Sequence, residues 1–146
     1  MHIRLLFATA DEATRALLHS LLDSAIQLSC PPVVRMEVAT RSALLERAKA
    51  SLDDVILLDW ALADAGTPDL VRELLGQDPQ LRTVVLLPQD MRQYREQVWN
   101  AGACNSIPKE HMDQEWLASI LCVMFRAMQR EARLRASFAA LAQPAD

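Results

Sequence analysis

The sequence has few glycines, few aromatic residues and an odd number of cysteines. Only three glycines occur among 146 residues, and none lies in a loop that could cradle a phosphate, which argues against a nucleotide or flavin site. The cysteines, Cys30, Cys104 and Cys122, lack metal-ligand spacing, so we expect reduced, buried thiols in a reducing compartment. The three histidines are equally scattered, and the sequence predicts no metal site.

Long hydrophobic runs and an excess of positive charge are also missing. Residues 1–12 contain only a short apolar run before acidic residues, which excludes a signal peptide or membrane span in that segment. The formal net charge of -4 provides no overall attraction for nucleic acid or an anionic membrane. With 51% hydrophobic residues, the chain can bury one core. We therefore expect a soluble, cytoplasmic protein without nucleic-acid or membrane partners.

The chain does contain a regular alternation of apolar segments and helical patterns. The expected strands are residues 3–8, 33–39, 55–58, 83–87 and 104–107. Five strand–helix pairs with short connections predict an α/β fold, a parallel sheet with helices on both faces. The second strand alternates apolar and polar residues and the fifth is weak, so both are placed at the edges. The flavodoxin-like order 2-1-3-4-5 satisfies this placement.

Asp59 ends the third apolar run, in the segment VILLD at residues 55–59. A charge at the end of a strand buried on both faces would be costly to bury alone. In a sheet of this order, the reactive crevice lies at the carboxyl ends of the first and third strands. The sequence therefore marks Asp59 as a candidate functional residue.

Two motifs, LLDW around Asp59 and AGACNSIPKE around Lys109, give the chain its family resemblance. Through them, residues 1–125 resemble the receiver domains of two-component response regulators. The resemblance implies that Asp59 matches the phospho-acceptor and that Lys109 matches the lysine that contacts the phosphoryl group. It also implies an acidic pair that holds magnesium and a hydroxyl group that binds a phosphoryl oxygen.

Five positions depart from the receiver pattern. Thr9 and Ala10 stand where the family has its acidic pair, and Asp11 comes one position late. Pro88 replaces the hydroxyl residue, and Ser106 replaces the usual aromatic residue of the last strand. Magnesium prefers hard oxygen ligands that include carboxylates, and proline offers neither a hydroxyl nor an amide proton. We therefore predict no metal and no cofactor, with magnesium required only if Asp59 is phosphorylated.

Three hypotheses follow for Asp59. In the first, Asp59 and Lys109 keep an ion pair, and the chain is a non-catalytic signalling and protein-interaction module, a degenerate receiver. In the second, Asp59 is a working phospho-acceptor. In the third, the chain is a small enzyme, which requires a deep open pocket at this crevice. We expect Asp11 to cap the following helix and Trp60 to fill the former metal site.

The end of the chain is longer than a receiver requires. No proline or glycine interrupts residues 113–141, which predicts a helix on the order of 43 Å long. Residues at heptad spacing follow this helix: Ile120, Met124, Ala127, Glu131, Leu134, Phe138 and Leu141. Residues 126–146 are interpreted as a helical extension, either a coiled coil or a linker, that continues the last helix of the receiver-like domain.

The heptad pattern has two interpretations. In one, Met124, Leu134, Phe138 and Leu141 form the interface of a homodimer or bind another protein partner. In the other, the stripe packs on the sheet for its first half and frays afterwards. The extension also resembles the helical linkers that join receivers to output domains, which implies that an output domain is a further possible partner.

Overall fold

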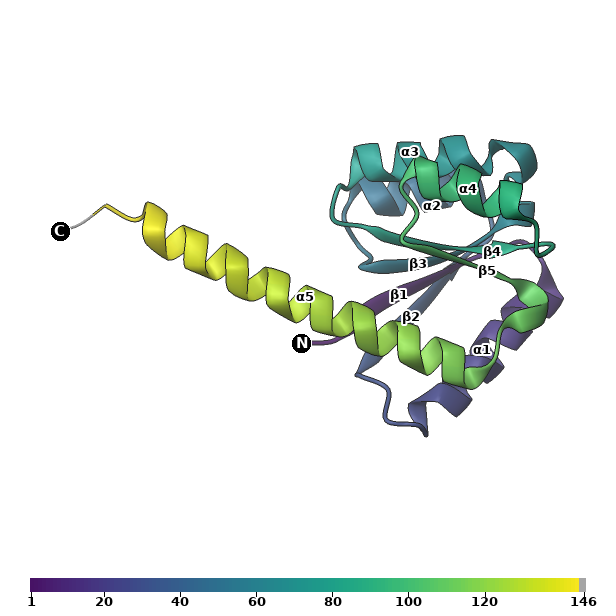
Figure 1. Cartoon of the computed structure of the whole chain (residues 1–146), viewed down its shortest axis with the longest axis horizontal. Helices are drawn as coiled ribbons and strands as arrows, with labels where there is room; N and C mark the ends of the chain where they lie inside the picture. Colours follow the sequence, from purple (N-terminus) through teal and green to yellow (C-terminus); the bar gives the residue numbers. More distant parts are fainter. Residues whose placement is uncertain (145–146) are drawn as a thin grey trace.

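Five parallel strands form the centre of the structure, a computed structural model that describes residues 1–144 (Figure 1). The strands are β1 (Ile3–Ala8), β2 (Val33–Val38), β3 (Val55–Asp59), β4 (Arg82–Leu87) and β5 (Asn105–Pro108). They lie in the order β2-β1-β3-β4-β5, and all neighbours are parallel. The predicted α/β fold and its flavodoxin-like sheet order are confirmed.

Helices cover both faces of the sheet. They are α1 (Glu12–Ile26), α2 (Arg41–Lys49), α3 (Thr67–Gln77), α4 (Arg92–Ala101) and α5 (Gln114–Ala142). Figure 1 shows α1 and α5 on one face, with α2, α3 and α4 on the other. Short connections between parallel strands and crossing helices produce this three-layer arrangement.

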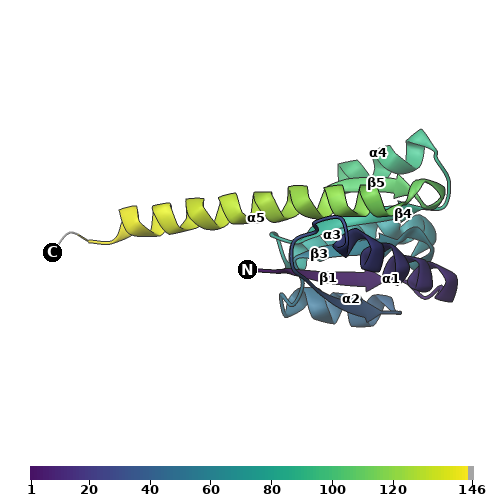
Figure 2. The same cartoon turned by 90° about the horizontal axis from the view of Figure 1, so that it is seen from below.

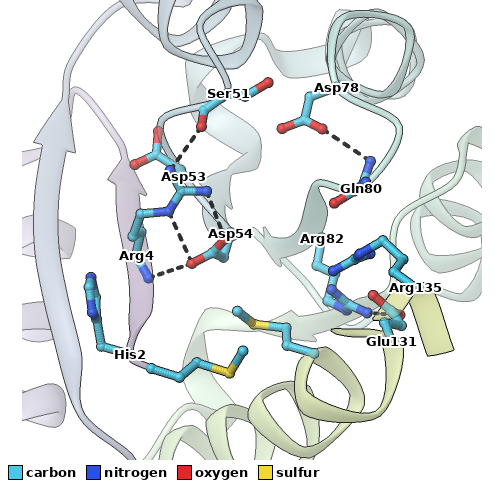
Figure 3. A pocket seen from close by; sticks show the side chains of 12 residues that line it. His2, Arg4, Ser51, Asp53, Asp54, Asp78, Gln80, Arg82, Glu131 and Arg135 are labelled. Carbon is cyan, nitrogen blue, oxygen red and sulfur yellow. Dashed lines mark hydrogen bonds and ion pairs between the residues drawn. The ribbon is translucent and has the colours of Figure 1, made fainter. Parts of the chain in front are cut away.

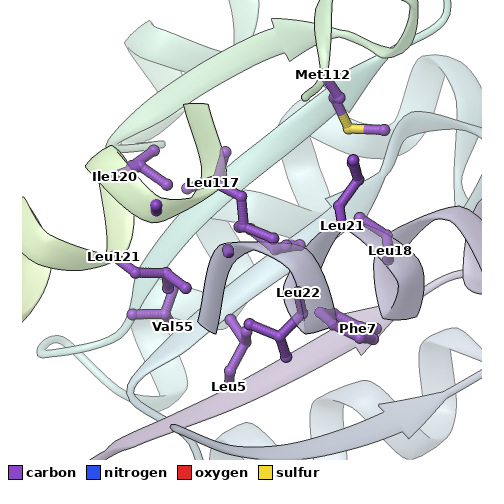
Figure 4. Packing of buried hydrophobic residues seen from close by; sticks show 14 of the residues in the cluster. Leu5, Phe7, Leu18, Leu21, Leu22, Val55, Met112, Leu117, Ile120 and Leu121 are labelled. Carbon is purple, nitrogen blue, oxygen red and sulfur yellow. The ribbon is translucent and has the colours of Figure 1, made fainter. Parts of the chain in front are cut away.

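Alternating side chains of the strands build two apolar clusters. On β1, Leu5 and Phe7 point toward α1 and α5, whereas Leu6 points toward α2 and α3, because successive strand residues face opposite ways. In Figure 4, leucines of α1 and α5 pack over Leu5 and Phe7. The strands β1, β3 and β4 are buried almost throughout, but β2 has no fully buried residue. The sheet pattern thus confirms β2 as an edge strand.

The long helix α5 has two different halves. Its first half packs on the sheet, and its second half projects away from the rest of the chain (Figures 1 and 2). Arg82 on β4 forms an ion pair with Glu131 close to the point where the helix departs. We call residues 132–142, which follow this ion pair, the helical tail. Residues 145–146 of the predicted extension lie outside the described residues.

The dimer stripe predicted from the heptad pattern is divided between these halves. Met124 is 6% exposed and packs in the cluster between α5 and the sheet, so the prediction that it belongs to an intermolecular interface is wrong. Leu134, Phe138 and Leu141 on the helical tail are 58%, 68% and 81% exposed. Among the described residues, no helix has both the length and the apolar character needed to cross a membrane.

Candidate functional site

Asp59 lies at the carboxyl end of β3 and is 1% exposed. The chain turns immediately after it into a short 3-10 helix, Trp60–Leu62, and the Ala61 amide donates a 3.0 Å hydrogen bond to Asp59 Oδ1. The apolar run of β3 therefore places the carboxylate at the end of the sheet, where the turn supplies its first partner. A buried carboxylate needs such partners because desolvation disfavours its charge.

Two further side chains complete the environment of Asp59. Lys109 directly follows β5, and its Nζ atom lies 2.8 Å from Asp59 Oδ1. Thr9 directly follows β1, and its hydroxyl donates a 2.7 Å hydrogen bond to Asp59 Oδ2. The expected pairing of Asp59 with Lys109 is therefore present, and both carboxylate oxygens have partners.

These contacts continue into a closed ring of hydrogen bonds. The Asp11 amide donates to Thr9 Oγ1 at 3.1 Å, and Asp11 Oδ2 accepts from the Thr14 amide at 3.1 Å and the Thr14 hydroxyl at 2.6 Å. Lys109 Nζ donates to Thr14 Oγ1 at 3.1 Å, which returns the ring to Asp59. We call Thr9, Asp11, Thr14, Asp59 and Lys109 the Asp59 network.

The predicted capping role of Asp11 is confirmed within this network. Its carboxylate accepts from the Thr14 amide at the start of α1, as an N-cap residue does. The hydrogen bonds from the Thr14 hydroxyl and amide, helped by the charge of Lys109, lower the pKa of Asp11 below its ordinary value. The negative charge of Asp11 is thus used in holding the first turn of α1.

Sequence reasoning missed two functional groups of the network. The receiver pattern marks Thr9 only as a missing acid, although its hydroxyl is the partner of Asp59 Oδ2. Thr14 was not singled out, although it joins Asp11 to Lys109. The available signal for Thr14 was its position three residues after a capping aspartate, where a polar side chain can contact the cap.

Among the described residues, the remaining predicted positions form no hydrogen bond or ion pair with the Asp59 carboxylate. Ala10 and Pro88 are exposed, and Ser106 on β5 is half-buried opposite Val85. Trp60 is buried against Tyr94, with ring centroids 4.7 Å apart, in the cluster beneath α2 and α3. The side chains that bind the carboxylate oxygens of Asp59 are therefore Thr9 and Lys109, and not Trp60.

The oxygen donors near Asp59 do not fit a magnesium site. Asp59 is buried, the Thr9 hydroxyl donates its hydrogen bond to the Asp59 carboxylate, and the Asp11 carboxylate accepts from Thr14. Within residues 1–144, no three His, Cys, Asp or Glu side chains form a group that could hold a metal ion. Magnesium requires several hard oxygen ligands in near-octahedral order, whereas this arrangement is already closed by internal hydrogen bonds.

A cavity of about 500 Å³ lies at the amino ends of the strands, opposite the end where Asp59 lies (Figure 3). Arg4 reaches it and is bound to Asp54, with 2.9 Å between Nη2 and Oδ1. Arg82 and Glu131, which also line it, form the ion pair at the departure of the helical tail. Asp59 and Lys109 do not line this cavity, so it is not the open crevice that the enzyme hypothesis requires.

Comparison with known proteins finds solved structures with the same fold as this chain. The chain is similar to a signal receiver domain of a protein described as a LuxO repressor from Vibrio parahaemolyticus, with TM-score 0.75, 14% identity, and coverage of 92% of this chain and 98% of that one. The chain has the receiver fold. No family model matches the sequence, and no curated protein matches it.

Two other solved structures are similar to the chain in fold. The receiver domain of a sensor histidine kinase from Pseudomonas aeruginosa, with magnesium in its active site cleft, matches at TM-score 0.67 and 19% identity, covering 83% of this chain and 95% of that one. A protein described as pilus assembly-related from Burkholderia pseudomallei matches at TM-score 0.69 and 20% identity, covering 84% and 88%. At these identities the comparisons establish the fold alone.

Proposed function

We propose that this chain is a receiver-type signalling module that acts by binding a protein partner, without magnesium-dependent phosphorylation of Asp59. The observation that carries the proposal is the closed Asp59 network. Both oxygens of the Asp59 carboxylate are held within the chain, by Thr9 on one side and by Ala61 and Lys109 on the other.

The chemistry of phosphoryl transfer supports this proposal. An acceptor carboxylate needs a free oxygen to attack phosphorus and cations to neutralise the crowded oxygens. Asp59 is 1% exposed, so an incoming phosphoryl group would have to displace Thr9 or Lys109 from it. Thr9 and Ala10 add no negative charge for a metal ion. The network therefore acts as a structural ion pair that fixes the ends of β1, β3 and β5.

The partner in this proposal is a second copy of the chain, bound through the helical tail. Leu134, Phe138 and Leu141 lie at spacings of four and three residues, which places them on one stripe of α5. The same stripe packs on the sheet in the first half of α5, and it continues into the tail with no cover from residues 1–144. A helical segment that projects into water without packing is marginally stable, and pairing with an identical stripe would stabilise it.

Exposure to a small-molecule phosphodonor tests the proposed function. The wild-type chain and the Asp59→Asn variant are incubated with acetyl phosphate and magnesium, and their intact masses are compared. The proposal predicts no phosphoryl group on either protein. A phosphoryl adduct on the wild type that is absent from the variant would overturn it.

The second candidate function is a phosphorylatable receiver. Asp59 and Lys109 are both present at the carboxyl ends of their strands, and the similar Pseudomonas receiver holds magnesium in its active site cleft. In this candidate, Thr9 and Lys109 release Asp59 when the phosphodonor binds. The acetyl phosphate experiment separates the two functions, because only the second leads to a modified Asp59.

A further inference from the structure

Two of the three cysteines approach the same loop. Cys122 lies on the first half of α5, and its Sγ atom is 3.8 Å from the Ser29 carbonyl oxygen, within range of a weak S–H to O hydrogen bond. Ser29 directly precedes Cys30 in the connection between α1 and β2. The expectation that the cysteines are buried is wrong for Cys104 and Cys122, which are exposed, and Cys30 is half-buried.

The surroundings of Cys30 bring it close to α5. Cys30 packs against the apolar cluster formed by α1, α5 and the sheet. Burial raises the pKa of the Cys30 thiol, and the negative charge of a Cys122 thiolate raises it further. Cys122 Sγ contacts the carbonyl oxygen of the residue directly before Cys30, so the two cysteines lie near each other where the α1–β2 connection meets α5.

The backbone at Ser29 supports a defined loop at this place. Ser29 has a φ angle of +69°, the left-handed conformation that few non-glycine residues adopt. Pro31 and Pro32 follow Cys30 and restrict the chain on its other side. Cys30 therefore lies in a segment whose backbone is restricted on both sides.

We propose that Cys30 and Cys122 form a thiol pair that closes into an intramolecular disulfide when the protein reacts with hydrogen peroxide. Cys122 is the more exposed thiol, so its sulfur attacks the peroxide first, which breaks the O–O bond, forms a sulfenic acid and releases one water. The sulfur of Cys30 then attacks the sulfenic sulfur and expels a second water. The two thiols lose two electrons and two protons, and the peroxide is reduced to two waters.

The disulfide would change how α5 is attached. It joins the α1–β2 connection to the half of α5 that packs on the sheet, across 92 positions of the sequence. A link over such a long loop restricts the unfolded chain and raises stability. In a reducing compartment the link is transient, so it would respond to oxidant instead of acting as a permanent staple. The helical tail would then extend from a base that oxidation makes more rigid.

Thiol counting on matched variants tests this proposal. The wild type and the Cys30→Ser, Cys122→Ser and Cys104→Ser variants are treated with hydrogen peroxide, and free thiols are counted after denaturation. Non-reducing peptide mapping then identifies any cross-link. The wild type and Cys104→Ser are expected to lose two thiols each, to contain a peptide linking residues 30 and 122 within one chain, and to show a higher unfolding temperature that reductant reverses.

The control variants make the test decisive. Cys104 lies just before β5, where its amide donates a 2.8 Å hydrogen bond to the Thr83 carbonyl on β4, so Cys104→Ser is expected to leave the pair intact. Cys30→Ser and Cys122→Ser are expected to form no such cross-link and to show no reversible rise in unfolding temperature. A cross-link through Cys104, oxidation only between chains, or a wild type whose thiols become sulfinic acids without pairing would overturn the proposal.

Discussion

The Asp59 network and the helical tail differ in how far the chain satisfies them by itself. Asp59 carries a buried charge. Its two carboxylate oxygens accept hydrogen bonds from Thr9 and Ala61, and it forms an ion pair with Lys109. Leu134 and Phe138 on the tail are apolar, yet they are 58% and 68% exposed. The polar site is therefore complete within one chain, whereas the apolar stripe is incomplete. This contrast is the reason for proposing partner binding, and not phosphotransfer, as the function.

The largest expected effect concerns the helical tail. Burial of one leucine or phenylalanine side chain contributes about 1.5–3 kcal/mol, so two losses per chain exceed what a modest symmetric interface can tolerate. The Leu134→Ala, Phe138→Ala double variant is expected to sediment as a monomer at micromolar concentration, and the wild type is expected to sediment as a dimer. Its unfolding temperature should stay nearly unchanged, because neither residue contributes to the core.

A matched control locates the dimer interface. Val123 is 68% exposed on α5, as Phe138 is, but it lies outside the heptad stripe on the half that packs on the sheet. Val123→Ala is expected to remain dimeric. A wild type that is monomeric would contradict the dimer proposal, and a double variant that stays dimeric would move the interface from the tail to the receiver body.

The second effect concerns the ion pair inside the Asp59 network. Lys109→Ala leaves Asp59, which is 1% exposed, without its cation, and loss of one member of a buried pair costs about 3–5 kcal/mol. Asp59→Asn removes the stranded charge and should restore most of the free energy of unfolding in the double variant. Urea unfolding of the wild type, both single variants and the double variant measures the coupling. Simple addition of the two losses would mean that the residues are not paired.

The third effect concerns the hydroxyl group of Thr9. Thr9→Val keeps the shape of the side chain but removes the donor to Asp59 Oδ2 and the acceptor for the Asp11 amide. An unsatisfied buried polar group costs about 1–3 kcal/mol, which urea unfolding can detect. Thr9→Ser keeps the hydroxyl and should lose clearly less. Equal losses in both variants would show that the methyl group, not the hydroxyl, is what stabilises this position.

A smaller effect is expected from acid at Asp11. The pKa of Asp11 in the folded chain lies below its ordinary value of 3.8, because Thr14 donates hydrogen bonds to the charged carboxylate. The stability that Asp11 contributes is therefore complete above that ordinary value and is lost as the pH falls through the lowered pKa. The stability difference between wild type and Asp11→Ala should shrink in this acidic range. A stability difference that does not change with pH would mean that the charge of the Asp11 carboxylate does not contribute to it.

The sheet was predictable because burial leaves a direct trace in the sequence. Continuous apolar runs marked the central strands. The alternation Val34, Arg35, Met36 marked an edge strand but not its buried face, because Val34 and Met36 are 50% and 48% exposed. Asp59 and Lys109 were predictable because parallel strands bring their carboxyl ends together. The role of Thr9 could not be read in this way, because a hydroxyl suits many environments and only the folded chain selects its partner.

Met124 shows a different limit of sequence reasoning. Its heptad position is equivalent to those of Leu134 and Phe138, so spacing alone assigns all three to one surface. Only the fold determines that the sheet covers Met124 and ends before Leu134. A periodic stripe identifies an apolar face, but it does not identify what covers that face.

The central claim is that the Asp59 network is a closed structural site and not a magnesium-dependent acceptor. The most direct test is a titration of the isotope-labelled chain with magnesium and beryllofluoride, an acyl phosphate mimic, followed by NMR at the amides of Asp59, Ala61 and Lys109. A Thr9→Asp, Ala10→Asp variant, which adds two carboxylates next to Asp59, is the positive control. The account predicts no saturable shift in the wild type, whereas saturable shifts at millimolar magnesium would contradict it.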